Sequence, residues 1–193
     1  RRSRDVDAIT SRRMNQEFFY PSGNSVPLED LLVPKAREFS RYLASVGPEV
    51  FAELHEVRKT NAQDGEVVVF SVDVERPQKV IHDIRHKERL AVIFWNDDTR
   101  YPEVLSLRKN FPNAPHLNLR EEELPRSLCL YDQSYEQVRL TWTPATFLER
   151  IRFWLAGTAV GTLHGEDQPL EPYLDASGAY LIVPSDFTVS DIK

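Results

Sequence analysis

The only cysteine in the 193-residue sequence, Cys129, is the residue best suited to nucleophilic chemistry. A thiolate accepts an acyl group by exchange with another thioester, a reaction that needs no strong base. A single thiol also excludes an internal disulfide and any metal site built from several thiolates, and it is typical of a reducing compartment such as the cytoplasm. Cys129 is therefore either an inert, buried side chain or the reactive centre of the protein.

Few side chains near Cys129 in the sequence are suited to assist such chemistry. Arg126 is the nearest cation and would favour the thiolate. A cysteine hydrolase would also need a histidine base. No helix is predicted to begin at the cysteine and lower its pKa, so a hydrolase is the least favoured of the functions considered for this cysteine. His82 and His86 have the spacing of helical metal ligands, but no third ligand accompanies them. The sequence therefore predicts no metal site and no cofactor.

Hydrophobic spacing predicts the elements that position the cysteine. Apolar residues recur at intervals of three and four behind Pro34, which predicts a helix that ends near Gly47. Runs rich in β-branched and apolar residues predict four strands, at 50–57, 66–74, 90–95 and 104–107. Because the connections are too short for parallel crossovers, we expect an antiparallel meander.

The cysteine itself lies in a long segment, 111–132, that has no clear period and holds three prolines. Loops of this length in a compact domain are usually functional. Thr143 and Pro144 then provide the N-cap and first residue of a second helix, whose apolar face extends to about Ala159. The predicted fold class is α+β: helix, four-stranded antiparallel meander, long loop with the cysteine, and helix.

Composition indicates one globular domain with flanking segments. The proportions of 41% hydrophobic and 28% charged residues are typical of a globular protein. Because no stretch approaches about 18 uninterrupted apolar residues and the arginine-rich start lacks an apolar core, we expect neither a membrane span nor a secretory signal. A net charge of −6 argues against general nucleic-acid binding, so we expect neither a nucleic-acid nor a membrane partner. We divide the chain into a lead-in segment at 1–27, a domain at 28–162, and a C-terminal extension or linker to a following domain at 163–193.

Four short strings, in the order of these elements, resemble motifs of the ubiquitin-conjugating enzyme family. They are Tyr101-Pro102, His116-Leu117-Asn118, Ser127-Leu128-Cys129-Leu130 and Trp142-Thr143-Pro144-Ala145. These look like the family's Tyr-Pro turn, its His-Pro-Asn motif, its active-cysteine string and its Trp-Ser-Pro-Ala helix start. The resemblance covers about 34–159 and is closest to the divergent prokaryotic branch, in which the conjugating domain can run on into an adenylating domain.

The resemblance implies an acyltransferase. Cys129 would accept a ubiquitin-like protein from an activating (adenylating) enzyme, in the same chain or separate, and pass it to an amine of a protein target. The resemblance also suggests a prokaryotic, antiviral-defence setting in the cytoplasm. A non-catalytic binding module of the same fold is the alternative function, and the presence of Cys129 favours the carrier.

The resemblance also suggests roles for the residues around the cysteine. It assigns to Asn118 the stabilisation of the oxyanion that forms when an amine attacks the thioester. The alternative role of Asn118 is to brace the loop by hydrogen bonds from its side chain. His116, Tyr101, Pro102 and Trp142 are expected to support the structure of the site.

Overall fold

The computed structural model describes residues 17–46, 51–60 and 65–163. The chain divides into two compact units, 1–163 and 164–193, and every described residue belongs to the first. The extension predicted at 163–193 therefore lies almost wholly outside the described residues, as do residues 1–16 of the predicted lead-in segment.

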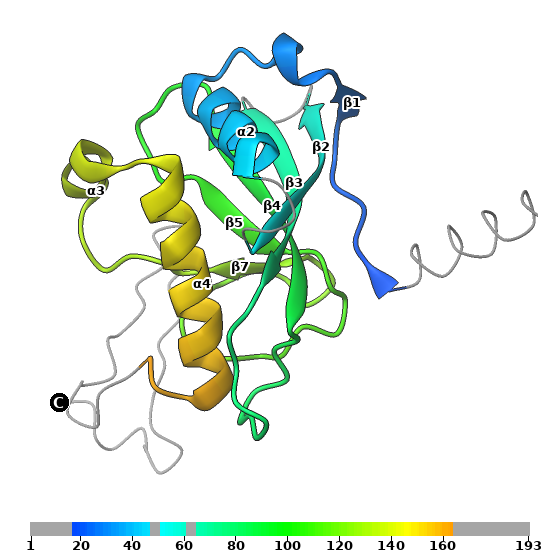
Figure 1. The fold of residues 1–193 in the computed structure, drawn as a ribbon, viewed down its shortest axis with the longest axis vertical. Coiled ribbons are helices and arrows are strands. Elements are labelled where there is room, and N and C mark those ends of the chain that lie inside the picture. Colours follow the sequence, from blue (N-terminus) through cyan, green and yellow to red (C-terminus); the bar gives the residue numbers. More distant parts are fainter. Residues whose placement is uncertain (1–16, 47–50, 61–64, 164–193) are drawn as a thin grey trace, which may run out of the picture. The chain divides into compact units, whose positions relative to one another are not determined.

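Seven strands of the described residues form one sheet in which all neighbouring strands are antiparallel (Figure 1). The strands are β1 (Asn24–Val26), β2 (Ala52–Lys59), β3 (Gly65–Asp73), β4 (Lys87–Trp95), β5 (Glu103–Ser106), β6 (Leu117–Asn118) and β7 (Arg126–Leu128). Their order across the sheet is β1-β2-β3-β4-β5-β7-β6. The four consecutive strands β2 to β5 lie side by side, as expected where each connection simply reverses the chain.

Helices cover one face of this sheet. Within the described residues they are the 3-10 helix η1 (Leu28–Asp30) and the α-helices α2 (Pro34–Val46), α3 (Tyr135–Thr141) and α4 (Pro144–Val160). Figure 1 shows α2 and α4 in front of the strands, with the short α3 leading into α4. The combination of helices with an antiparallel sheet confirms the predicted α+β class.

An aromatic core attaches α2 and α4 to the sheet. Phe39 of α2 packs edge-on against Phe70 of β3 and against Phe147 of α4, with 5.4 Å between ring centroids in each pair. Phe94 of β4 lies 5.7 Å from Phe39, and all four rings are buried. Because burying a side chain of this size contributes about 1.5–3 kcal/mol, this cluster fixes both helices on the sheet.

Polar groups complete the first turns of the two long helices. The buried carboxylate of Glu66 accepts hydrogen bonds from the backbone N–H groups of Leu32 and Val33, at 2.7 and 2.8 Å, where the chain enters α2. At the start of α4 the hydroxyl of Thr143 accepts a hydrogen bond from the N–H of Thr146 at 3.1 Å. These contacts satisfy N–H groups that have no partner inside a helix, and they confirm the cap predicted at Thr143.

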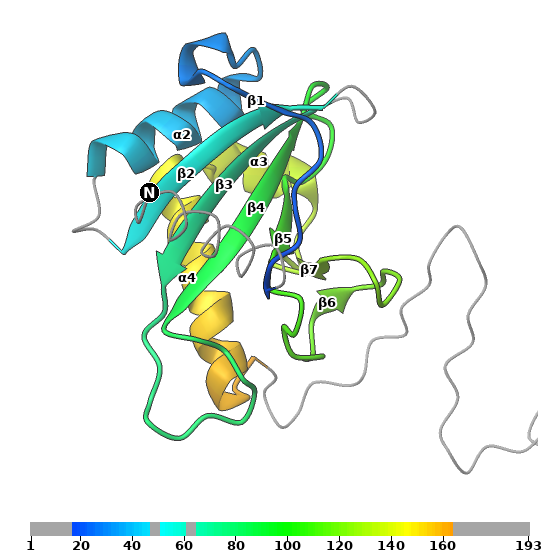
Figure 2. The same cartoon turned by 90° about the vertical axis from the view of Figure 1, so that its right-hand side faces the viewer.

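The other face of the sheet is covered by the segment that leads into β1. Phe18 and Phe19 pack against a second apolar cluster, and the N–H of Phe19 donates to the carbonyl oxygen of Leu107 at 2.7 Å. That cluster consists of Val67, Val69, Ala91, Ile93, Leu105 and Leu107. Figure 2 shows this segment in front of the strands. Because both faces of β3 are buried, its sequence holds a continuous apolar run, Val67 to Phe70, rather than an alternating pattern.

The segment predicted as one irregular loop, 111–132, contains two short strands, β6 and β7. Asn118 of β6 pairs with Ser127 of β7, and β7 also pairs with β5 through Val104 and Leu128. Two or three residues are too short to show the two-residue period of a strand, so the sequence does not reveal this pairing. On the β5 side the sheet therefore extends two strands beyond the predicted meander, and β7 ends directly before Cys129.

Candidate functional site

Cys129 is the first residue after β7 and is partly exposed. Its backbone N–H donates to the carbonyl oxygen of His116 at 2.9 Å, which continues the pairing of the two strands by one more bond. Its thiol lies 3.9 Å from the carbonyl oxygen of Tyr131, a weak sulfur contact. The sheet thus fixes the backbone of the cysteine while the side chain stays accessible.

A cavity of about 400 Å³ opens beside the thiol. It is lined by Trp95, the run 100–103, Asn118 and the run 128–131. The register of the sheet explains this meeting of distant segments. Since Val104 of β5 is paired antiparallel with Leu128 of β7, the residues before Val104 lie next to the residues after Leu128.

The cavity brings together four of the six residues that the sequence selected. Cys129, Asn118, Tyr101 and Pro102 all line it. Pro102 is buried, as expected for a packing residue. His116 and Trp142 are not among the lining residues.

The amide of Asn118 braces the strand that precedes the cysteine. Its Nδ2 donates to Oγ of Ser127 at 2.9 Å and to the carbonyl oxygen of Leu128 at 3.4 Å. Both contacts are with β7, directly before Cys129. These hydrogen bonds add a side-chain link to the backbone pairing of β6 with β7.

Two tyrosines, Tyr101 and Tyr131, line one side of the cavity, and the buried Tyr135 packs against Tyr101. The ring of Tyr101 stacks on Tyr131 with centroids 5.3 Å apart, and it meets Tyr135 edge-on at 5.2 Å. Burial raises the pKa of Tyr131 to about 12. Burial also raises the pKa of Tyr101, and the negative charges of Glu136 and Asp132 raise it further. These phenols stay protonated at neutral pH, so they shape the site rather than act as bases.

His116 and Trp142 lie outside the cavity lining. His116 has a φ of 59°, in the left-handed region that few side chains adopt, and this turn directs its carbonyl oxygen to the N–H of Cys129. Trp142 packs against Phe94 and Phe147, with centroid distances of 6.3 and 5.9 Å, and Nζ of Lys35 lies 5.4 Å from its ring. The supporting roles expected for His116 and Trp142 stay predictions.

Sequence reasoning missed several residues of the cavity, above all Arg100. We expected Arg126 to be the cation nearest the reactive group, but Arg126 does not line the cavity and Arg100 does. The two segments that form the site meet only through the pairing of β5 with β7, and sequence separation does not show that. The one available signal is that Arg100 directly precedes Tyr101-Pro102.

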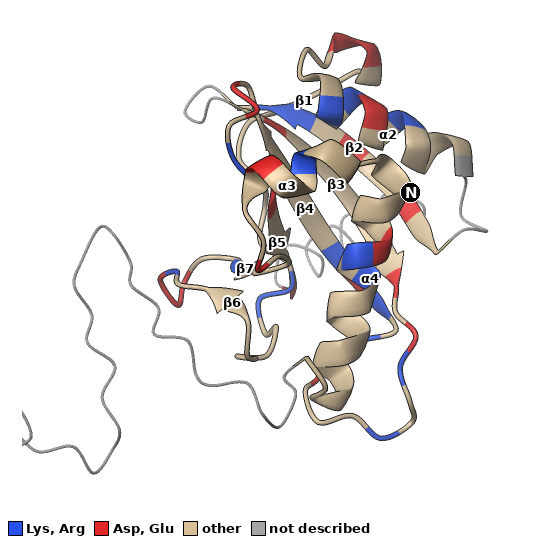
Figure 3. Cartoon of the chain, turned by 90° about the vertical axis from the view of Figure 1, so that its left-hand side faces the viewer, with Lys and Arg blue, Asp and Glu red and all other residues tan. Residues whose placement is uncertain are grey.

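Charge around the site is uneven. Figure 3 shows acidic residues on the loop between β6 and β7, where 121–123 lie. Arg120, next to this run, pairs with Glu103 of the cavity wall at 3.6 Å.

No group of three or more His, Cys, Asp or Glu side chains within residues 17–46, 51–60 and 65–163 is placed to hold a metal ion. In the same ranges, no helix combines the length and apolar character needed to cross a membrane.

A mixed α+β domain with a partly exposed cysteine beside a Tyr-Pro turn is compatible with a ubiquitin-conjugating (E2-like) domain. The chain belongs to prokaryotic E2 family A, whose family model matches residues 50–192, more than half of the sequence. Searches of the curated proteins and of the solved structures returned no match. Membership of this family associates the chain with ubiquitin-like conjugation, as a conjugating transferase, and implies a ubiquitin-like protein and an activating enzyme as partners.

Proposed function

We propose that the chain is a ubiquitin-conjugating-like carrier, which holds a ubiquitin-like protein as a thioester on Cys129 and transfers it to an amine. The observation that carries this proposal is the place of the only thiol: Cys129 is partly exposed and lines the cavity beside Tyr101 and Pro102. A cysteine that serves only for packing is expected in the apolar core instead.

Loading is an exchange between two thioesters. The thiolate of Cys129 attacks the carbonyl carbon of the modifier's C-terminal residue, a new C–S bond forms, and the thiolate of the activating enzyme leaves. Reactants and products have similar energies, so the site needs access and orientation more than a strong base. A partly exposed thiol on a backbone fixed by β6 and β7 supplies both.

Transfer to an amine makes a further demand, because the carbonyl oxygen gains negative charge when the amine attacks. The C–N bond then forms, the C–S bond breaks, and the amine proton passes to water. A fixed amide donor would stabilise this oxyanion. The described contacts of Asn118 favour the other role, since its Nδ2 donates to Ser127 and Leu128, and we propose that Asn118 positions the thiol.

The order of elements supports the same proposal. α2 precedes the consecutive strands β2 to β5, and α4 follows the segment that carries Cys129. This is the order of helix, meander, active-site loop and helix that the family resemblance implies. We therefore propose a ubiquitin-conjugating fold for the domain at 28–162, with β7–β6 at one edge of its sheet and β1, from the preceding segment, added at the other.

Incubation with the cognate activating enzyme, ATP and the ubiquitin-like protein tests the proposal. The expected product is one adduct that a reducing agent removes, and Cys129→Ala should not form it. Chasing the loaded protein with free lysine should release the modifier as its lysine amide. A stable complex with the modifier and no adduct at any time would support the non-catalytic binding module instead.

A further inference from the structure

The guanidinium of Arg100 is held on an aromatic platform at the cavity. Its central carbon lies 3.9 Å from the centroid of the Trp95 ring. The indole N–H of Trp95 donates to the carbonyl oxygen of Tyr101 at 2.9 Å, so the ring has a fixed orientation. Arg100 and Trp95 both line the cavity that Cys129 lines, so the cation and the thiol face the same cavity.

The hydrogen-bond donors of Arg100 have no protein partner among the described residues. Asp97 is near enough for the charge of Arg100 to help lower the pKa of its carboxyl group, but the main cause is the hydroxyl of Thr99, which donates to it at 2.8 Å. Two other arginines near the cavity, Arg120 and Arg150, have such partners. Arg120 pairs with Glu103, and Nε of Arg150 donates to the carbonyl oxygen of Leu130 at 2.5 Å.

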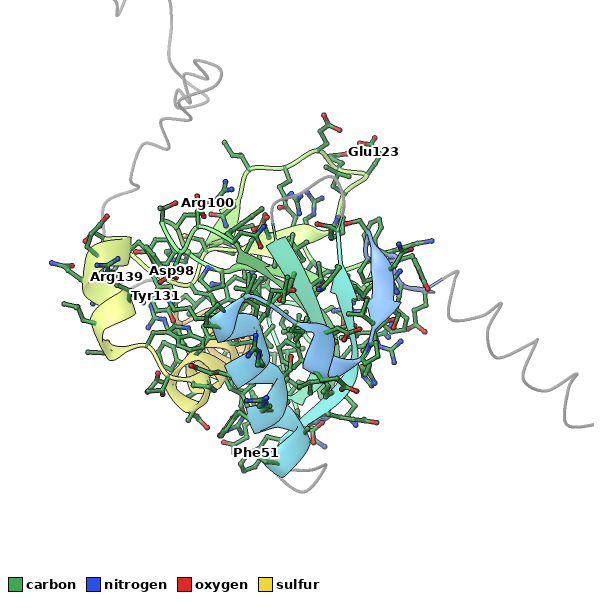
Figure 4. All side chains as sticks on the ribbon, turned by 90° about the horizontal axis from the view of Figure 1, so that it is seen from above. Phe51, Asp98, Arg100, Glu123, Tyr131 and Arg139 are labelled. Atoms are coloured by element: carbon green, nitrogen blue, oxygen red, sulfur yellow. The ribbon has the colours of Figure 1, made fainter. Side chains whose placement is uncertain are left out.

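A guanidinium that stacks through its face keeps the N–H groups of its edge free. Those groups form a planar fork that matches the two oxygens of a carboxylate. Arg100 is also exposed, so a ligand can reach it (Figure 4). The thiol of Cys129 is proposed to carry an acyl group in the same cavity. The oriented guanidinium of Arg100 is therefore suited to bind an acidic group near the acyl carbon.

We propose that Arg100 binds a carboxylate side chain of the substrate next to the reacting carbonyl and thereby selects that substrate. The inference rests on the proposed thioester chemistry of Cys129 only for the identity of the substrate. The carboxylate belongs either to the C-terminal tail of the ubiquitin-like protein or to a residue beside the accepting lysine. The ion pair with Arg100 is the same in both cases. A carboxylate of the ubiquitin-like protein would act in loading, and one beside the accepting lysine would act in discharge.

Binding is tested without any reaction, by following the indole N–H signal of Trp95 in ¹H–¹⁵N spectra. The probes are the peptide amides acetyl-Glu-Gly-Gly and acetyl-Gln-Gly-Gly, which differ only in charge. Trp95→Phe assigns the signal among the three tryptophans of the sequence. The Glu peptide should shift it and bind about fivefold more tightly than the Gln peptide, a difference of about 1 kcal/mol, the upper range for an exposed ion pair.

Matched variants show whether Arg100 causes this preference. Arg100→Ala should abolish it, and Arg100→Lys should keep only part of it, since a lysine lacks the planar fork. Arg139→Ala removes another exposed arginine, on α3 and outside the cavity lining, and should leave the preference unchanged. Equal response of Trp95 to both peptides in the parent protein would overturn the inference.

Two reaction arms identify the source of the carboxylate. In the donor arm, the N-acetylcysteamine thioesters of the same peptides react with the thiol of Cys129, N-acetylcysteamine leaves, and intact mass reports loading. In the acceptor arm, loaded protein is discharged to lysine peptides that carry Glu or Gln beside the lysine. If either arm prefers Glu and Arg100→Ala removes the preference, the inference is supported. The arm that shows the preference identifies the carboxylate as part of the ubiquitin-like protein or of the target.

The two proposals fail in different ways. If no thioester loads Cys129 but Trp95 still responds to the Glu peptide through Arg100, the carrier function is wrong and the carboxylate site stands. If Cys129 loads and discharges with no preference for Glu in either arm, the selection of substrate by Arg100 is wrong and the carrier function stands.

Discussion

Two arginines of this domain, Arg108 and Arg100, are held in opposite ways. The side chain of Arg108 is 0% exposed and that of its partner Glu88 is 1% exposed. Arg108 donates to both carboxylate oxygens of Glu88, at 3.1 and 2.7 Å, and to Asp83 at 2.9 Å. Arg100 is exposed, stacks on Trp95, and has no polar partner among the described residues.

The difference separates a structural site from a recognition site. A buried charge is tolerated only when its hydrogen bonds are satisfied, so the region around Arg108 is closed to further ligands. The region around Arg100 keeps an oriented cation with free donors beside a cavity and a thiol. Loss of Arg108 should therefore affect folding, whereas loss of Arg100 should affect only substrate preference.

The largest effect on stability is expected from Arg108→Ala. The substitution leaves the carboxylate of Glu88 buried without its partner, which costs about 3–5 kcal/mol of unfolding free energy. Urea denaturation measures this loss, and Arg100→Ala serves as the matched control that should change stability by less than about 0.5 kcal/mol. Equal stabilities for the two variants would show that the contrast between the two regions is wrong.

Asn118→Ala should have an intermediate effect, on rate rather than on folding. If Asn118 positions Cys129 through Ser127 and Leu128, its loss slows loading and discharge alike, by about tenfold, which corresponds to about 1.4 kcal/mol. Single-turnover loading and discharge to free lysine measure the two steps separately. A variant that loads at the parental rate and discharges about a hundredfold more slowly would instead assign Asn118 to the oxyanion.

The elements of the core were predictable because their signals are local. Pro34 and Thr143 mark the starts of α2 and α4 in the sequence, and the structure places both helices there. Dense runs of valine and other apolar residues mark β3 and β4 in the same way. Each of these sequence patterns lies within a single helix or strand, so recognising it does not require knowing how the strands pair.

The cavity was only partly predictable because it depends on pairing. Tyr101, Asn118 and Cys129 were selected through motif strings. For Arg100 the only signal was its place directly before Tyr101, and for Trp95 there was none. Their position follows from the register between β5 and β7, and β7 has only three residues. Strands that short carry no pattern of their own, and their place is set by the tertiary structure.

The smallest effect is expected at His55, on β2. Nε2 of His55 lies 2.6 Å from Oγ of Ser71, and partial burial, followed by the charge of Arg89, lowers the pKa of His55 below its usual value of 6.5. As the pH falls below about 6.5, the unfolded chain takes up this proton first, so folded-state stability declines until the pH passes the lowered pKa.

Urea denaturation at pH 7 and at pH 5.5 measures the contribution of His55. The parent protein should lose more stability between these pH values than His55→Asn, which has no group that titrates there. Identical pH dependence for the two proteins would show that His55 does not titrate differently on folding, and that its contact with Ser71 is no more than a surface hydrogen bond.

The most direct test of the account is the chemistry of the bond at position 129. The parent protein and Cys129→Ser are each incubated with the activating enzyme, ATP and the ubiquitin-like protein, and intact mass is recorded before and after treatment with dithiothreitol. We predict that the parent adduct is a thioester and is lost, whereas the serine variant forms an oxygen ester that dithiothreitol does not cleave. A dithiothreitol-resistant adduct on the parent protein, or a reducible adduct that persists in Cys129→Ser, would contradict the account.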